Sequence, residues 1–201
     1  VARDALAPSI EKRGLTVTVL VNNAGFSTMG PVHKSDPARE VAMIRTDVEA
    51  VAHLCSTFVP GMVASGRGAV LNVASVASFQ PLPGQAGYGA SKAFVLSYTR
   101  SLGGELRGTG VTATCLCPGP VATGFGEAAG FSKEDAETSL PSFMWETPEA
   151  VAKAAGALGQ GPRGLGPPLL RKLATTAAHI GPPPPAADLP PSLLVYGAKI
   201  V

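Results

Sequence analysis

Apolar runs and helical periodicities alternate along the first part of the chain. Residues 15–21 (LTVTVLV), 68–74 (GAVLNVA) and 111–117 (VTATCLC) are apolar and rich in β-branched side chains, as expected for strands covered on both faces. Two long helical patterns, Asp36 to Ala64 and Tyr88 to Leu106, lie between these runs. The alternation of strand, helix, strand, helix and strand predicts an α/β fold with a doubly wound parallel sheet.

The two ends of the chain have different patterns. Residues 1–13 carry apolar side chains four positions apart and predict the end of an amphipathic helix. Thr147 followed by Pro148 is typical of a helix N-cap and first turn, and an alanine-rich segment follows. Beyond Gly159, 9 of the 19 prolines of the chain predict an irregular tail, with room for a short edge strand at Leu193 to Tyr196.

Composition and charge exclude several classes of protein. With 16 Lys and Arg against 14 Asp and Glu, the net charge of +2 provides no basic surface for a nucleic-acid partner. Hydrophobic residues make up 45% and charged residues 15%, which predicts a folded chain. No apolar run is long enough to span a bilayer, and no secretory signal is present, so we expect a cytoplasmic protein.

Cysteine and histidine give no sign of a metal or disulfide site. The chain has three cysteines, and Cys115 and Cys117 are expected to point to opposite faces of their strand. The three histidines are scattered without the spacing of metal ligands. We therefore predict no metal centre.

Tyr88 and Lys92 are the first candidates for chemistry. They are four residues apart at the start of a predicted helix and therefore share a face. An ammonium group beside a phenol lowers the tyrosine pKa from about 10 toward neutral pH, as a general acid or base requires. A tyrosine and a lysine at this spacing occur often by chance, so an ordinary pair on the helix surface is the alternative.

Other polar and small residues follow the predicted strands. Ser75 comes directly after the run at 68–74, where its hydroxyl could hold a substrate carbonyl oxygen while Tyr88 protonates it. The segments 22–25 (NNAG) and 118–123 (PGPVAT) follow the other two runs. Because the carboxyl ends of parallel strands meet at one edge of the sheet, these segments predict a single cleft.

Several polar residues near this edge have a second, structural interpretation. Asn22 and Asn23 also suit a polar clamp between strands, and both roles are compatible. Ser78 and Ser91 are expected to be structural hydroxyls of a loop and a helix.

Taken together, the motifs NNAG, YGASK with a serine thirteen residues before its tyrosine, and PGPVAT resemble the short-chain dehydrogenase/reductase family. The resemblance covers about residues 1–155. It implies a Rossmann-like sheet that binds NAD(H) or NADP(H), with NADP(H) preferred, and hydride transfer between the nicotinamide and a small-molecule carbonyl or alcohol. The chemistry would belong to the cofactor, and the protein would supply position and a proton.

The resemblance also assigns roles to residues. Tyr88 would be the general acid/base, Lys92 would lower its pKa and hold the nicotinamide ribose, and Ser75 would orient the substrate oxygen. Further contacts with the cofactor would come from Asn22, Ala24, Gly25, Pro118, Gly119, Val121 and Thr123.

Asp47 departs from the family pattern. The resemblance places an asparagine there, whose backbone carbonyl holds a water linked to the catalytic lysine. Aspartate has the same backbone carbonyl. Its side-chain carboxylate near Lys92, however, would favour the charged form of the lysine and could hold the ammonium away from the role that the resemblance assigns to it. Asp47 is therefore a candidate site residue, and an ordinary aspartate at a helix bend is the alternative.

A second departure is the absence of a T-G-x-x-x-G-x-G segment before NNAG. In the family this turn receives the cofactor pyrophosphate at a helix N-terminus. We therefore expect a Rossmann-like sheet without its first three strands and glycine-rich turn. Residues 1–158 would form the C-terminal two-thirds of the domain, 159–201 would be a Pro/Gly-rich tail, and the strand at 15–21 would have an exposed apolar edge.

The predicted function is reduction of an apolar ketone or acyl substrate, because the segment Gly124 to Trp145 is rich in aromatic side chains. The two long helices predict a homodimer. One alternative is a non-catalytic remnant that acts as an interaction or scaffold module. Another is a sensor that binds the nucleotide without turnover.

Overall fold

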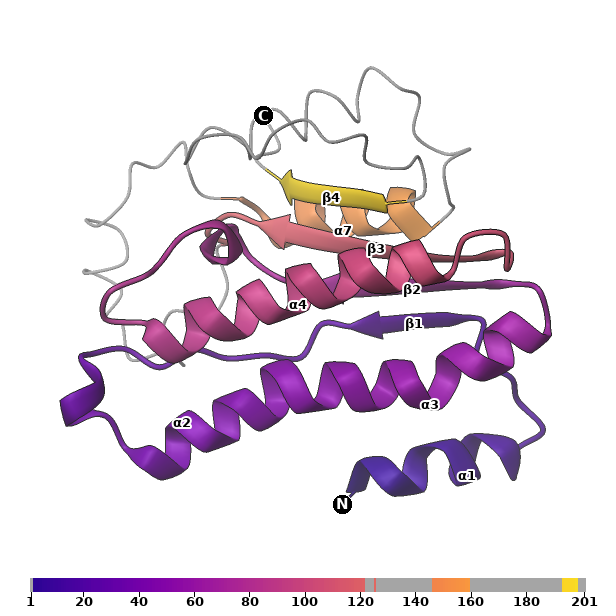
Figure 1. The fold of residues 1–201 in the computed structure, drawn as a ribbon, viewed down its shortest axis with the longest axis horizontal. Helices are drawn as coiled ribbons and strands as arrows, with labels where there is room; N and C mark the ends of the chain where they lie inside the picture. Colours follow the sequence, from indigo (N-terminus) through magenta and orange to yellow (C-terminus); the bar gives the residue numbers. More distant parts are fainter. Residues whose placement is uncertain (1, 122–124, 126–145, 160–192, 199–201) are drawn as a thin grey trace.

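The fold is a parallel sheet of four strands in the order β1-β2-β3-β4 (Figure 1). The computed structural model describes residues 2–121, 125, 146–159 and 193–198. The strands are β1 (Val19–Asn22), β2 (Gly68–Val73), β3 (Val111–Pro118) and β4 (Leu193–Ala198). Each strand pairs in parallel with the next, so the predicted doubly wound α/β class is confirmed.

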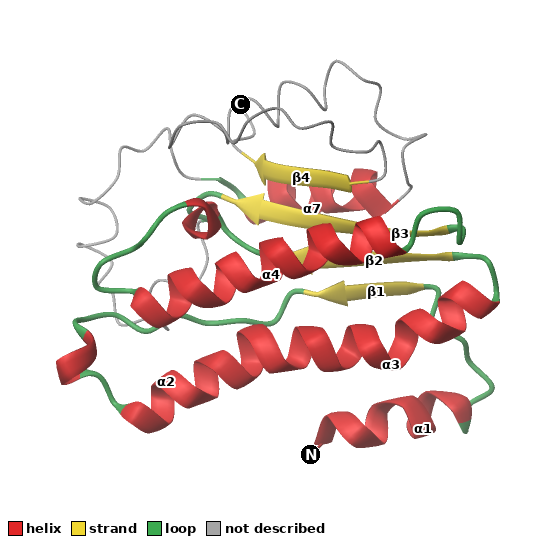
Figure 2. Ribbon diagram, viewed as in Figure 1, coloured by secondary structure: helices red, strands yellow, loops and turns green. Residues whose placement is uncertain are grey.

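Helices cover both faces of this sheet (Figure 2). The two longest helices, α3 and α4, pack on one face, and α7 packs behind β2 and β3. The helical elements are η1 (Ala2–Ala5), α1 (Leu6–Glu11), η2 (Val32–Lys34), α2 (Pro37–Ile44), η3 (Arg45–Glu49), α3 (Ala50–Ala64), η4 (Val76–Phe79), α4 (Ala86–Glu105) and α7 (Pro148–Gly159).

The predicted helix over Asp36 to Ala64 is divided into α2, η3 and α3. Asp36 caps α2 as its pattern suggests, accepting a hydrogen bond from the backbone N–H of Ala38 at 3.0 Å. The middle element, η3, is a single turn of π-helix that contains Asp47. Such a wide turn changes the direction of the side chains that follow it, and here it turns Asp47 inward, where it is buried.

The cap of α7 is confirmed. The Thr147 hydroxyl accepts a hydrogen bond from the N–H of Ala150 at 3.2 Å. The short strand expected at Leu193 to Tyr196 is also confirmed as β4, at the edge of the sheet beside β3. The rest of the predicted irregular tail lies outside the described residues.

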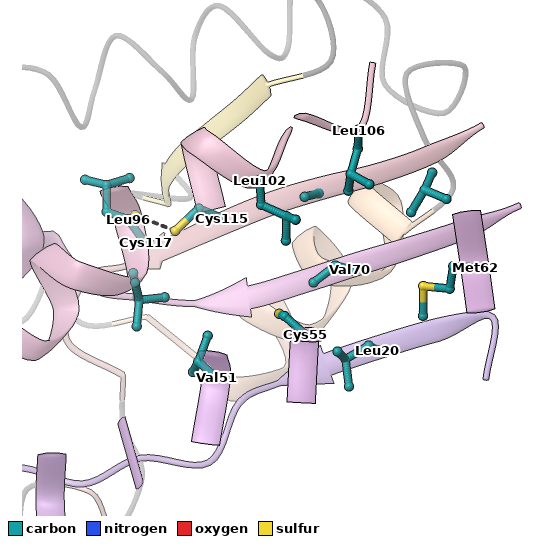
Figure 3. Close-up of a cluster of buried hydrophobic side chains, with 14 residues drawn as sticks. Leu20, Val51, Cys55, Met62, Val70, Leu96, Leu102, Leu106, Cys115 and Cys117 are labelled. Carbon is teal, nitrogen blue, oxygen red and sulfur yellow. Dashed lines mark hydrogen bonds between the residues drawn. The ribbon is translucent and has the colours of Figure 1, made fainter. Parts of the chain in front are cut away.

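The core lies between the sheet and helices α3 and α4 (Figure 3). Leu20 of β1, Val70 of β2 and Ala113 of β3 are in register and form one apolar row across the sheet. The expectation that Cys115 and Cys117 point to opposite faces is wrong. Residues two apart in a strand share a face, and the two sulfur atoms lie 3.8 Å apart in the core.

Strand β1 is shorter than predicted and forms an edge among the described strands. It begins at Val19 rather than Leu15, because β2, the described strand that pairs with it, begins opposite this point. Val19 and Val21 on the face away from α3 are 54% and 52% exposed. In the part of the chain that the structure describes, the expected exposed apolar edge is therefore confirmed.

Candidate active site

The carboxyl ends of β1, β2 and β3 meet at one edge of the sheet, where the sequence placed the site. The turn η3 and the first turns of α4 approach the same edge, since α4 packs against η3 and η4. Residues of η3, of α4 and of the segments that follow β1 and β2 therefore come together there.

Lys92 and Asp47 form a buried ion pair. The distance from Lys92 Nζ to Asp47 Oδ2 is 3.0 Å, and the two residues are 4% and 1% exposed. Lys92 Nζ also donates a hydrogen bond to the carbonyl oxygen of Val73 at 3.2 Å, and Asp47 Oδ1 accepts one from the N–H of Phe26 at 3.1 Å. Burial raises the pKa of Asp47, while Lys92 and the Phe26 N–H oppose the rise.

Tyr88 lies beside this pair, but the environment shifts its pKa in the direction opposite to the predicted one. Lys92 Nζ is 5.6 Å from the centre of the Tyr88 ring, so the shared helix face is confirmed. Burial of the side chain, with a contribution from the Asp47 charge, raises the pKa of Tyr88 to about 12, although an interaction with the Ser75 hydroxyl lowers it. The predicted lowering of the Tyr88 pKa is therefore wrong, because burial of the phenol favours its neutral form.

Ser75 lies directly after β2 and caps η4. Its Oγ accepts a hydrogen bond from the N–H of Ala77 at 3.2 Å, and its own N–H donates to Ser78 Oγ at 3.4 Å. The Ser78 hydroxyl in turn donates to the carbonyl oxygen of Lys92 at 2.9 Å. Ser78 is therefore structural, as expected, and it ties the serine segment to the helix that carries Tyr88.

The Asn22 side chain is buried and bonds to a polar side chain of the neighbouring strand. Its Nδ2 donates to Asn72 Oδ1 at 2.8 Å, and Asn72 Nδ2 donates to Thr99 Oγ1 at 2.9 Å. Asn22 and Asn72 are also paired in the strand register. The clamp between strands is thus the role that these contacts support, and the sequence analysis did not single out Asn72 or Thr99, although both are polar residues inside apolar segments.

Gly25 and Phe26, which follow β1, pack against the Asp47–Lys92 ion pair. A Cβ atom on Gly25 would lie 2.9 Å from Asp47 Oδ2 and 3.0 Å from Lys92 Nζ, so this position has no room for a side chain. The structure gives Gly25 this packing role, and its predicted contact with the cofactor stays a prediction. The Phe26 backbone is a contributor that sequence reasoning missed, because a backbone N–H carries no sequence signal.

Comparison with known proteins identifies the family. The family model described as short chain dehydrogenase matches residues 2–133. The chain belongs to the short-chain dehydrogenase family. An NADP-dependent 3-hydroxy acid dehydrogenase of Escherichia coli strain K12 is 32% identical over 156 residues, which are 76% of this chain and 63% of that protein.

Two further comparisons bear on the site. A Xanthobacter autotrophicus protein named inactive 2-(S)-hydroxypropyl-CoM dehydrogenase 2 is 33% identical, with 69% of this chain matching 64% of that protein. The crystal structure of a Burkholderia cenocepacia gluconate 5-dehydrogenase in complex with NADP and tartrate has a TM-score of 0.67 at 26% identity, and the match covers 76% of this chain and 61% of that one. The chain therefore spans less than two thirds of the length of these family members.

The remaining residues that were predicted to contact the cofactor lie at the edge of the sheet or outside the described residues. Ala24 is exposed after β1, as is Asn23. Pro118 is the last residue of β3, Gly119 follows it, and Val121 forms an isolated parallel bridge with Glu146. Thr123 lies outside the described residues.

The nicotinamide end of a dinucleotide fits the residues present. The Lys92 ammonium has three N–H donors, and one of them bonds to the Val73 carbonyl oxygen. The ammonium also pairs with Asp47 at 3.0 Å, so a donor is still left for a ribose hydroxyl. The small, exposed Ala24 permits close approach at the end of β1.

Among the described residues, no helix is both long enough and apolar enough to cross a bilayer.

Proposed function

We propose that this chain forms the catalytic part of an NAD(P)(H)-dependent oxidoreductase that reduces a carbonyl group. The observation that carries the proposal is the meeting of the Ser75 and Tyr88 hydroxyls beside Lys92 at the carboxyl edge of the sheet. The names of the relatives, an NADP-dependent dehydrogenase and an NADP-bound structure, support the cofactor class and a preference for NADP(H).

In this mechanism the bound cofactor would supply the hydride. The Tyr88 hydroxyl donates its proton to the carbonyl oxygen, and the Ser75 hydroxyl holds the same oxygen in place. The remaining Lys92 N–H binds the ribose, and Ala24, Gly119 and Val121 border the nicotinamide. A tyrosine whose pKa is about 12 carries its proton at neutral pH, which suits a proton donor in reduction.

We further propose an apolar substrate. The Phe125 ring contacts the Tyr88 ring, with centroids 5.7 Å apart, and Phe26 and Leu82 pack in the same cluster. A carbonyl that reaches Tyr88 would therefore meet apolar side chains. Turnover of long apolar ketones at the same rate as short polar ones would argue against this preference.

The experiment is consumption of NADPH and NADH with a panel of carbonyl compounds, comparing the natural protein with its Tyr88→Phe variant. Loss of the phenol proton should reduce kcat by about 10²-fold or more. Tyr98→Phe is the matched control, because Tyr98 lies on the same helix but stacks on Phe94. Turnover that survives Tyr88→Phe would contradict the assignment.

A second candidate, a non-catalytic interaction module, is favoured by the Asp47–Lys92 ion pair, which occupies the lysine that the chemistry needs. The similarity to a relative named as inactive supports the same alternative. Calorimetric titration with NADPH separates the possibilities. Binding without consumption would indicate a nucleotide sensor, and neither binding nor consumption would indicate the interaction module.

We also propose that α3 and α4 form a homodimer interface. Phe94 of α4 is 37% exposed and stacks on Tyr98, which leaves an aromatic surface on the outside of this helix. Sedimentation of the natural protein and a Phe94→Ser variant tests the interface, and an unchanged dimer would contradict it. A cytoplasmic location stays a prediction of the sequence.

A further inference from the structure

The Asp47 carboxylate is a buried charge that the proposed proton transfer does not use. Its Oδ2 is 3.0 Å from Lys92 Nζ, and its Oδ1 accepts the hydrogen bond from Phe26. Asp47 is 1% exposed, and its two oxygens fill the space beside Gly25, where a Cβ atom would lie within 3.0 Å of both. The ion pair is therefore a buried part of the site.

This carboxylate changes what Lys92 does to Tyr88. An ammonium 5.6 Å from the phenol ring would by itself favour the phenolate. A carboxylate 3.0 Å from that ammonium compensates its charge, and the negative charge also opposes ionisation of the phenol directly. Both effects act in the same direction, since each favours the neutral tyrosine.

Other polar groups face the pair from neighbouring elements. Among the described residues these are the Ser75 hydroxyl at the end of β2, the Cys115 thiol on β3, and Glu40 of α2, whose carboxylate lies against Gly87 beside Tyr88. The charged groups that bear on the Tyr88 phenol are Lys92, whose ammonium lies 5.6 Å from the ring centre, and Asp47, which raises the pKa of the phenol and pairs with Lys92.

We propose that Asp47 is a positioning residue that acts through Lys92 to keep the Tyr88 hydroxyl protonated through neutral and alkaline pH. The inference rests on the proposed role of Tyr88 as the proton donor in carbonyl reduction. It adds that Asp47 opposes the effect of the neighbouring ammonium on the phenol, so that the pairing of Lys92 works together with burial to keep the donor protonated.

The test is a spectroscopic titration of Tyr88 without cofactor or substrate. In a Tyr98→Phe/Tyr196→Phe background, Tyr88 is the one remaining tyrosine of the chain, and its ionisation is followed by the ultraviolet absorbance of the phenolate. We expect a midpoint clearly above the ordinary tyrosine value of about 10. Asp47→Asn should lower this midpoint by about one pH unit or more, because it leaves the ammonium uncompensated.

Glu49→Gln is the matched control. Glu49 belongs to the same η3 turn, but its side chain is exposed and pairs with Arg3, so the midpoint should stay in place. Asp47→Ser removes the same charge with a smaller side chain and serves if Asp47→Asn does not fold. A parent midpoint at or below about 10, or no shift in the neutral variants, would overturn the inference.

Activity measurements separate this inference from the proposed function. A lowered midpoint in a protein that consumes no NAD(P)H would support the role of Asp47 and contradict the reductase. An unmoved midpoint in an enzyme whose turnover depends on Tyr88 would contradict the role of Asp47 and leave the reductase intact. If both hold, the alkaline limb of the reduction rate should move with the midpoint.

Discussion

At the scale of single residues, the chemistry of the site depends on which charges lie beside one another. Tyr88 and Lys92 are adjacent as their spacing requires, yet the Asp47 carboxylate at 3.0 Å from Lys92 Nζ alters the effect of that adjacency. The spacing of two residues fixes a shared helix face, whereas the pKa of the tyrosine depends on burial and on a third residue from another element.

Gly25 gives a residue-scale prediction about this packing. Gly25→Ala would place a Cβ within 3.0 Å of Asp47 and Lys92 atoms, so we expect a loss of about 1–3 kcal/mol in the free energy of unfolding. The measurement is chemical denaturation followed by circular dichroism. Gly61→Ala is the control, because a Cβ there meets open space inside α3 and should stabilise the helix by about 0.5–1 kcal/mol. Equal stability of the two variants would contradict the crowded geometry.

At the scale of secondary-structure elements, a polar row joins the strands beneath the two long helices. Asn22 of β1, Asn72 of β2 and Cys115 of β3 are in register, and Thr99 of α4 bonds to Asn72. This polar row lies nearer the carboxyl ends of the strands than the apolar row that contains Leu20. Buried polar groups need partners of fixed geometry, so the row holds the strands and α4 in one arrangement at the site.

Asn72 is the centre of this row and gives an element-scale prediction. Asn72→Ala would leave the Asn22 amide and the Thr99 hydroxyl without these buried partners and should cost about 2 kcal/mol or more of unfolding free energy. Asn23→Ala is the matched control, since Asn23 is exposed and its loss should change stability by less than about 0.5 kcal/mol. Urea denaturation of both variants is the measurement, and a mild effect at Asn72 would argue against the clamp.

At the scale of the whole molecule, the described sheet is covered unevenly. Helices α3 and α4 cover one face, whereas α7 contacts β2 and β3 on the other face. The side chains of Val19 and Val21 on β1 therefore stay more than half exposed. Exposed apolar side chains on an unpaired strand edge favour association with other chains.

The β1 edge gives a prediction about self-association of this chain. A Val19→Thr/Val21→Thr double variant keeps the β-branched shape but makes the surface polar, so it should associate less as concentration rises. Sedimentation velocity over a concentration series measures this. Val41→Thr/Ile44→Thr on α2 is the control, because these two side chains are each 45% exposed but lie on a helix. Equal association of both variants would show that the strand edge has no special role.

The sequence by itself determined the order of strands and helices, the parallel sheet, the cap of α7 and the edge at which Ser75, Tyr88 and Lys92 meet. These features follow from local periodicity, capping chemistry and the rule that parallel strands end together. The tertiary structure alone decided that β1 starts at Val19, because strand ends depend on a partner. It also decided the inward turn of Asp47, the inward direction of Asn22 and the raised pKa of Tyr88, because burial and contacts between distant segments set all three.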